Sequence, residues 1–318
     1  MDEDRAATPA ARAARDDERP ADGPAADADH ALGLPGLSPN ASPSRLLRQL
    51  GLRPRKRFSQ SFLVDRRVPE AIVKAADVGP DDRVLEIGPG LGIMTRVLAR
   101  KAHDVVAVEL DRDLAEALPR LVPDNVEIVQ GDALEFDPAS RFGGPYKLVA
   151  NLPYAITSPF LFRYLDIRPA PAPIVVMIQR EVAERIAARP GALSYLAVAV
   201  KSVATVRLVR HVPPGAFHPR PKVESAVIRL DPRHEPLVPP EDRARFLELV
   251  RAGFAQPRKT VANSLAQGLG VERAVAVARL ERVGIAPERR PHELSLEEWR
   301  TLFEADQGTD SARPPGPA

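Results

Sequence analysis

The stretch Val84-Leu85-Glu86-Ile87-Gly88-Pro89-Gly90-Leu91-Gly92 decides the fold that this sequence predicts. A mainly apolar run typical of a strand enters a turn with three glycines, and a helical pattern follows to about Lys101. Glycine lets a backbone pass close to a ligand where a Cβ would collide, and the start of the following helix offers unpaired N–H groups. A dinucleotide-binding turn would have its third glycine at position 93, which is Ile93 here. The spacing therefore disfavours a nicotinamide dinucleotide.

The residues downstream of this turn repeat the alternation of strand and helix. Four more apolar segments have the length and composition of strands: Asp104–Leu110, Val126–Gln130, Lys147–Ala150 and Ile174–Ile178. Such strands, separated by helices, predict a mostly parallel sheet that helices cover on both faces. A later hairpin is expected from Val198–Val209 and Ser225–Leu230. The predicted fold class is therefore α/β, of the Rossmann-like kind.

Changes in composition divide the chain into five expected segments. Residues 1–43 are rich in Ala, Asp and Pro and nearly lack large apolar side chains, so we expect a disordered acidic tail. The α/β domain is expected over 44–231. A linker with four prolines covers 232–240, a helical domain covers 241–306, and a second disordered tail covers 307–318.

The helical domain is predicted from apolar spacing and from one capping signal. Phe246, Leu249 and Val250 recur at helical intervals. Ser295 and Glu298 have the spacing of a capping box, in which each side chain satisfies the other residue's backbone N–H at a helix start. We therefore expect a small helical domain after the α/β domain.

Cysteine content and charge limit the classes of site and partner. The 318 residues include no cysteine, which excludes disulfides, thiolate metal sites and a cysteine nucleophile. No apolar run approaches 18 residues, so no membrane span is expected and we predict a cytoplasmic protein. Residues 1–43 carry nine acids and four arginines, a charge of −5, which leaves +7 on the remainder of a chain of net charge +2. A basic body fits a polyanionic partner, and it equally fits an ordinary enzyme with surplus arginines.

Two acidic residues follow the next two predicted strands. Glu109 lies at the end of one strand and Asp132 just after the other. In this fold an acid at the first position can accept hydrogen bonds from two ribose hydroxyls, and Asp132 is placed to accept from an adenine amino group. Each acid alone could be a solvated loop residue. Because the carboxyl ends of parallel strands form one edge of the sheet, where ligands bind, both acids together with the glycine turn predict a nucleoside site.

The tetrapeptide Asn151-Leu152-Pro153-Tyr154 ends the fourth predicted strand and indicates the reaction. An exocyclic adenine amine is a poor nucleophile because its lone pair is delocalised into the ring. The side-chain carbonyl of Asn151 and the backbone carbonyl of Leu152 could accept hydrogen bonds from the two N–H groups of the amine. Both bonds would favour the pyramidal geometry that attack requires. Pro153 stiffens the turn, and Tyr154 can stack on the base. If the amine attacks the methyl group of a sulfonium donor such as S-adenosylmethionine, the reaction needs alignment and desolvation but no metal. The alternative is a plain turn, in which Asn and Pro serve only as turn formers.

Taken together, these segments resemble the small-subunit ribosomal RNA adenine dimethyltransferase family over about residues 45–305. The motifs that carry the resemblance are 56–63, 86–92, 109, 131–132, 151–154, 179–185, 217–227, 258–265 and 290–295. The resemblance implies a Rossmann-like S-adenosylmethionine-dependent methyltransferase domain followed by a small helical domain. By the family pattern, the residues at the cofactor site are Ser61, Leu63, Gly88, Gly90, Glu109, Asp132 and Asn151. Two residues depart from that pattern, because Ser59 replaces the usual glycine and Ser61 the usual asparagine.

The resemblance also implies the substrate. Four methyl groups would be transferred to the N6 atoms of two adjacent adenosines in a hairpin loop near the 3′ end of small-subunit ribosomal RNA, with a role in biogenesis of that subunit. We expect a monomer that binds this RNA or the immature small subunit. The expected RNA-contacting residues are Arg55, Lys56, Arg57, Phe217, Lys222, Arg258 and Lys259. The basic residues among them could equally be solvated surface charges, and Phe217 could be a core residue.

Two other functions fit the same motifs in part. An antibiotic-resistance methylase that acts on large-subunit ribosomal RNA shares the fold and an Asn-Leu/Ile-Pro-Tyr motif, but Gly88–Gly92 and Pro221–Val227 favour the small-subunit function. A non-catalytic assembly factor on the same fold would not need the intact glycine turn, Glu109 or Asn151–Tyr154.

Overall fold

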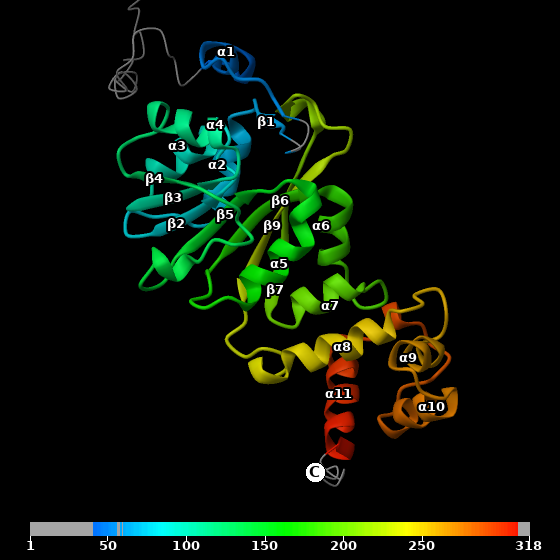
Figure 1. Ribbon diagram of the computed structural model, residues 1–318. Helices are drawn as coiled ribbons and strands as arrows, with labels where there is room; N and C mark the ends of the chain where they lie inside the picture. The colour runs from blue at the N-terminus through cyan, green and yellow to red at the C-terminus, as the bar shows by residue number, and fades with distance from the viewer. Residues whose placement is uncertain (1–40, 56–57, 59, 311–318) are drawn as a thin grey trace, which may run out of the picture. The chain divides into compact units, whose positions relative to one another are not determined.

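In the computed structural model, the glycine turn of residues 88–92 joins the first strand of a large sheet to a helix, as its sequence predicts (Figure 1). The structure describes residues 41–55, 58 and 60–310, with the backbone alone for 307–310. The large sheet has the strand order β4-β3-β2-β5-β6-β9-β7. Its strands are β2 (Arg83–Ile87), β3 (Asp104–Glu109), β4 (Val126–Gln130), β5 (Lys147–Asn151), β6 (Ile174–Gln179), β7 (Ala204–Val212) and β9 (Ser225–Pro232). The first five in this order are mutually parallel, which confirms the five strands predicted from the sequence.

Helices cover the sheet on both faces. Successive side chains of a strand point to opposite sides, so apolar residues on each face need helices to pack against. Val84 and Val149 pack with α2 (Arg67–Ala75) and α3 (Ile93–Ala99) on one face. Leu85 and Leu148 pack on the other face with α5 (Thr157–Asp166) and α6 (Arg180–Ala187) (Figure 1). Burial on both sides explains why the strands are almost continuously apolar.

The predicted hairpin forms, but its first strand begins later than expected. Strand β7 pairs antiparallel with β9 and starts at Ala204, whereas residues 195–201 form helix α7 (Tyr195–Lys201). The side chain of Ser194 caps this helix by accepting from the N–H of Ala197 at 3.2 Å. The prediction was wrong because the residues of this short run are almost all apolar. Such a run shows neither the two-residue alternation of a strand nor the 3.6-residue period of a helix.

Four longer helices follow the sheet: α8 (Arg243–Gly253), α9 (Val261–Leu269), α10 (Arg273–Arg282) and α11 (Leu296–Asp310). The capping box predicted at the start of α11 is present, with Ser295 N–H donating to Glu298 at 2.7 Å and Glu298 N–H donating to Ser295 Oγ at 3.1 Å. The helix runs to Asp310, four residues into the predicted C-terminal tail. Extending a nucleated helix costs little, and the first proline beyond it is Pro314.

The core of these helices includes residues from the α/β region. Ala197 and Val198 of α7 pack in the same cluster as Phe246 of α8 and Trp299 of α11. Buried Arg243 of α8 donates to Ser202 Oγ at 2.8 Å and pairs with Asp166 of α5. The residues predicted as a linker, 232–240, lie between β9 and α8, and Val238 among them is buried.

The elements that precede the large sheet in the chain include a helix and a short strand. Helix α1 (Pro43–Gln49) begins at the last residue assigned to the acidic tail, and residues 1–40 lie outside the described part of the chain. Strand β1 (Phe62–Leu63) pairs with β8 (Phe217–His218) in a separate two-stranded sheet. Helix α4 (Arg112–Ala117) follows β3. Short 3-10 turns cover Leu118–Arg120, Pro138–Ser140, Tyr154–Ile156, Pro214–Ala216, Pro240–Asp242 and Pro291–Glu293. Within residues 41–55, 58 and 60–310, no helix has the length and apolar character needed to cross a bilayer.

Candidate active site

A cavity opens at the carboxyl edge of the parallel strands, between the glycine turn and the small β1–β8 sheet. Ligands bind at this edge in open α/β sheets. The residues predicted for the cofactor and for catalysis all line the cavity: Ser61, Leu63, Gly88, Gly90, Glu109, Asp132, Asn151, Leu152, Pro153 and Tyr154. Five separate segments of the chain therefore meet at one place, as the sequence analysis expects.

The glycine turn leaves room in the cavity that side chains would fill. Gly88 and Gly90 have φ angles of 71° and 60°, in the left-handed region that L side chains rarely adopt. A Cβ on Gly88 would lie 3.3 Å from the backbone oxygen of Asn151, and one on Gly90 would lie 3.1 Å from the ring of Phe62. Glycine is therefore required here both for backbone conformation and for the space beside the turn.

Glu109 ends β3 with its carboxylate fixed by the backbone. Its two oxygens accept from the N–H of Gly90 at 3.0 Å and from the N–H of Asp111 at 2.9 Å. The residue is 7% exposed, and burial raises the pKa of its carboxyl although both N–H groups oppose the rise. A carboxylate has about four lone-pair positions, so acceptor capacity remains for a ligand's hydroxyls.

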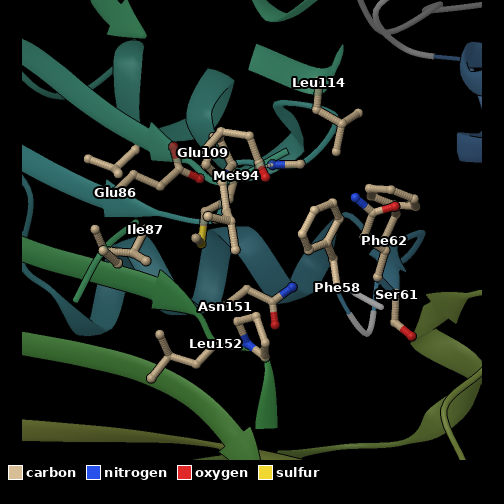
Figure 2. Close-up of a pocket in the computed structure, with 18 of the residues that line it drawn as sticks. Phe58, Ser61, Phe62, Glu86, Ile87, Met94, Glu109, Leu114, Asn151 and Leu152 are labelled. Atoms are coloured by element: carbon tan, nitrogen blue, oxygen red, sulfur yellow. Dashed lines mark hydrogen bonds between the residues drawn. The ribbon is translucent and has the colours of Figure 1, made fainter. Parts of the chain in front are cut away.

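Glu86 also lines the cavity, and the sequence analysis did not assign it a role. It is fully buried, and neither carboxyl oxygen has a hydrogen-bond partner among the described residues. Burial raises the pKa of Glu86 to about 8; the Thr95 hydroxyl lies near enough to oppose the rise but not in hydrogen-bonding geometry. A charged residue inside an apolar strand was the signal available in the sequence. Glu86 and Glu109 lie near the carboxyl ends of the neighbouring strands β2 and β3, and Figure 2 shows both at the pocket.

Burial of Glu86 makes stability depend on pH. Between pH 4.5 and about 8 the folded chain keeps a proton that the unfolded chain releases, so the free energy of unfolding should fall as pH rises through that window. The contribution approaches about 1 kcal/mol per pH unit. Urea unfolding at several pH values should show a shallower decline for Glu86→Gln. Glu135→Gln, at an exposed position, should keep the parent's slope, and an equally steep decline in the Glu86 variant would contradict the assignment.

Asp132 follows β4 and stays half-buried at the cavity. Its Oδ1 accepts from the N–H of Leu134 at 2.8 Å, and its backbone oxygen accepts from the N–H groups of Glu135 and Phe136. These bonds fix the direction of the carboxylate and leave Oδ2 for a donor in the cavity.

The Asn151–Tyr154 segment turns sharply at the end of β5. The N–H of Leu152 donates to the backbone oxygen of Met177 at 3.1 Å, which ties the turn to β6. Tyr154 bonds through its hydroxyl to Ser225 Oγ at 2.8 Å, and Ser225 is 1% exposed at the start of β9. Figure 2 shows the amide of Asn151 and the ring of Phe58 projecting into the same space.

The residues predicted to contact RNA divide into four groups. Phe217 is buried and lines the cavity, where it pairs with Leu63 across the β1–β8 sheet. Lys222, Arg258 and Lys259 are exposed and do not line the cavity. Arg55 forms ion pairs with Asp111 and Asp113. Lys56, Arg57 and the departing Ser59 lie outside the described residues.

Comparison with known proteins identifies the family. The model of the ribosomal RNA adenine dimethylase family matches residues 51–307. A ribosomal RNA small subunit methyltransferase A of Syntrophotalea carbinolica is 46% identical over 80% of this chain and 97% of its own. The protein of that name in Dehalococcoides mccartyi is 42% identical over 86% of this chain and 94% of its own.

Two solved structures share the fold. The 23S rRNA methyltransferase ErmE has a TM-score of 0.63 and 31% identity over 77% of this chain and 98% of its own. A dimethyladenosine transferase of Plasmodium falciparum has a TM-score of 0.65 and 25% identity over 78% of this chain and 98% of its own. With a family match over most of its length and relatives above 40% identity, the chain belongs to the ribosomal RNA adenine dimethylase family.

Proposed function

We propose that this protein is an S-adenosylmethionine-dependent enzyme that dimethylates the N6 atoms of two adjacent adenosines in the 3′-terminal hairpin loop of small-subunit ribosomal RNA, during cytoplasmic assembly of that subunit. The observation that carries the proposal is one cavity that holds the glycine turn, Glu109, Asp132 and the Asn151–Tyr154 turn. Membership of the adenine dimethylase family supports the reaction, and the names of the relatives above 40% identity support the small-subunit substrate.

The residues present fit the cofactor. When bound, S-adenosylmethionine supplies a methyl group on a positively charged sulfur. Glu86 offers a buried carboxyl without a partner to the ammonium of the amino-acid tail, and Glu109 offers free lone pairs to the ribose hydroxyls. Asp132, whose Oδ1 is fixed by the N–H of Leu134, would accept from the adenine amino group, and Gly88 and Gly90 would leave space beside the tail. Ser61 and Leu63 line the opposite side of the cavity.

The chain activates the target amine by orienting it. Asn151 Oδ1 and the backbone oxygen of Leu152 each accept a hydrogen bond from one N–H group of the adenine amine. The nitrogen lone pair then turns out of the base plane and toward the methyl donor. Pro153, with no N–H of its own, leaves those acceptors without an internal competitor. Stacking on Tyr154 holds the base once it has left its helix, and exclusion of water from the apolar cavity strengthens both hydrogen bonds.

The bond between Tyr154 and Ser225 should set the position of the stacking ring. Tyr154→Phe and Ser225→Ala should each lower kcat about tenfold with the cofactor Kd unchanged, because either change frees the ring from β9. Combining them should add little further loss, since both remove one interaction. Tyr195→Phe, whose hydroxyl contacts Arg251 outside the cavity, is the matched control. Additive losses in the double variant would show that the two residues act separately.

The exposed basic side chains Lys222, Arg258 and Lys259 are proposed contacts to RNA phosphates. Each such contact releases counterions, so removing one side chain should weaken binding and reduce its dependence on salt. Phe217 is proposed as part of the adenine pocket, because it lines the cavity on the side of Leu63.

Methyl transfer from labelled cofactor to undermethylated small and large ribosomal subunits tests the function directly. We expect label on two adjacent adenosines of the small-subunit RNA, four methyl groups per molecule. Label on the large subunit instead would favour the activity named for ErmE, whose 31% identity is below that of the small-subunit relatives. Absence of transfer to either, with intact cofactor binding, would favour an assembly factor.

A further inference from the structure

Arg55 and Gln60 attach the segment before β1 to the start of α4. Arg55 Nη1 donates to Asp111 Oδ1 at 2.6 Å, and a second guanidinium nitrogen pairs with Asp113. Gln60 Nε2 donates to Asp111 Oδ2 at 2.8 Å, while Gln60 Oε1 accepts from the backbone N–H of Arg55 at 2.7 Å. Arg55 and Gln60 therefore bond to the same carboxylate.

The same carboxylate belongs to the residue that orients Glu109. Asp111 is 3% exposed, and its N–H donates to Glu109, whose other oxygen accepts from Gly90. A continuous series of hydrogen bonds thus runs from Arg55 through Asp111 to the glycine turn. Asp111 also lies close enough to raise the pKa of Glu109, so a cation beside Asp111 offsets the crowding of two acids.

Described residues on both sides of Gln60 form one side of the cavity. Phe58, Ser61 and Phe62 all line it, and the ring of Phe62 lies against Gly90. Figure 2 shows Phe58, Ser61 and Phe62 together, across the cavity from Glu86 and Ile87. Without the bond from Gln60 to Asp111, the neighbouring residues Ser61 and Phe62 would be held less firmly beside the glycine turn.

We propose that Arg55 is a positioning residue for the cofactor, which keeps the side of the cavity lined by Phe58, Ser61 and Phe62 in place and keeps Glu109 directed at the ligand through Asp111. The inference rests on the proposed function, since it names the cofactor as the ligand. It assigns Arg55 to the cofactor in place of RNA, because a guanidinium that bridges two carboxylates has its charge and donors already engaged.

Calorimetric titration with S-adenosylhomocysteine, without RNA, tests the assignment on the full chain. Arg55→Gln should weaken binding about tenfold and leave RNA affinity within twofold of the parent. Arg53→Gln is the matched control, since it removes the same charge at an exposed position two residues earlier. Arg55→Lys should recover part of the affinity, because an ammonium keeps the charge but lacks the fork that reaches both carboxylates. In steady-state assays Arg55→Gln should raise KM for the cofactor more than it lowers kcat.

A second readout does not depend on the cofactor. Amide hydrogen exchange at Ser61–Leu63 should be faster in Arg55→Gln than in Arg53→Gln, with thermal midpoints compared to exclude general unfolding. Equal cofactor affinity in the two variants, or loss of RNA affinity alone in Arg55→Gln, would overturn the proposal. If the parent chain itself fails to bind S-adenosylhomocysteine, the proposed function fails; unchanged exchange at Ser61–Leu63 refutes the positioning role independently.

Discussion

Asn151→Ala is expected to lower kcat by about 10²–10³-fold, the range seen when one preorganised hydrogen-bonding group is removed from a reacting centre. The side-chain carbonyl of Asn151 lies at the end of β5, in the cavity that contains Glu109 and Asp132. Without it, the adenosine amine keeps one acceptor, on Leu152, and its lone pair stays delocalised in the ring. The measurement is single-turnover methyl transfer to undermethylated small subunits.

The cofactor should still bind this variant, with a Kd within about threefold of the parent's, because Glu86, Glu109 and Asp132 are untouched. A result in which kcat is unchanged would sink the proposed mechanism, and a loss confined to cofactor affinity would move Asn151 from the amine to the cofactor. Gln130→Ala is the matched control, since this amide is exposed at the end of β4, another parallel strand of the same sheet, and does not line the cavity.

Gly268→Ala is expected to destabilise the helices that follow the sheet by about 1–2 kcal/mol. Alanine in place of glycine inside a helix would by itself gain up to about 1 kcal/mol. A Cβ at this position of α9, however, would lie 2.4 Å from Cα and 2.5 Å from the backbone oxygen of Ala252 in α8. Overpacking typically costs about 1–3 kcal/mol, and backbone atoms in a packed helix cannot move aside, so the clash outweighs the gain in propensity.

Urea unfolding followed by circular dichroism measures this loss as a lower midpoint. Gly144→Ala provides the control, because a Cβ there meets nothing within 4 Å and the residue does not have a positive φ. A Gly268→Ala variant as stable as the parent would mean that α8 and α9 can separate without cost, contrary to their close contact.

Hydrophobic period and turn chemistry predicted most of the α/β region. Val126–Gln130 has the bounds expected of it, because a strand bounded by turn residues carries its signal locally. The Ser295–Glu298 capping box is likewise a signal within four residues. Residues 198–201 were wrongly predicted to begin a strand, since the helix there is stabilised by packing against α8 and by Ser194 rather than by its own period.

Some residues of the candidate site could be predicted from local sequence patterns and others could not. Motif spacing identified Gly88, Glu109, Asp132 and Asn151, because parallel strands bring their carboxyl ends to one edge whatever the details of packing. Motif spacing gave no role to Glu86, whose chemistry comes from complete burial. The prediction that Arg55 contacts RNA was based on its charge, and no local pattern indicated its ion pair with Asp111.

The sequence by itself determined the parallel strands, the glycine turn and the Asn151–Tyr154 turn, since each depends on residues that are close neighbours in the chain. Only the tertiary structure decided which side chains lose water and which charges pair across long separations. Arg55 meets Asp111 across 56 positions, and Tyr154 meets Ser225 across 71. Desolvation and ion pairing depend on distance in space, so no local pattern of residues encodes them.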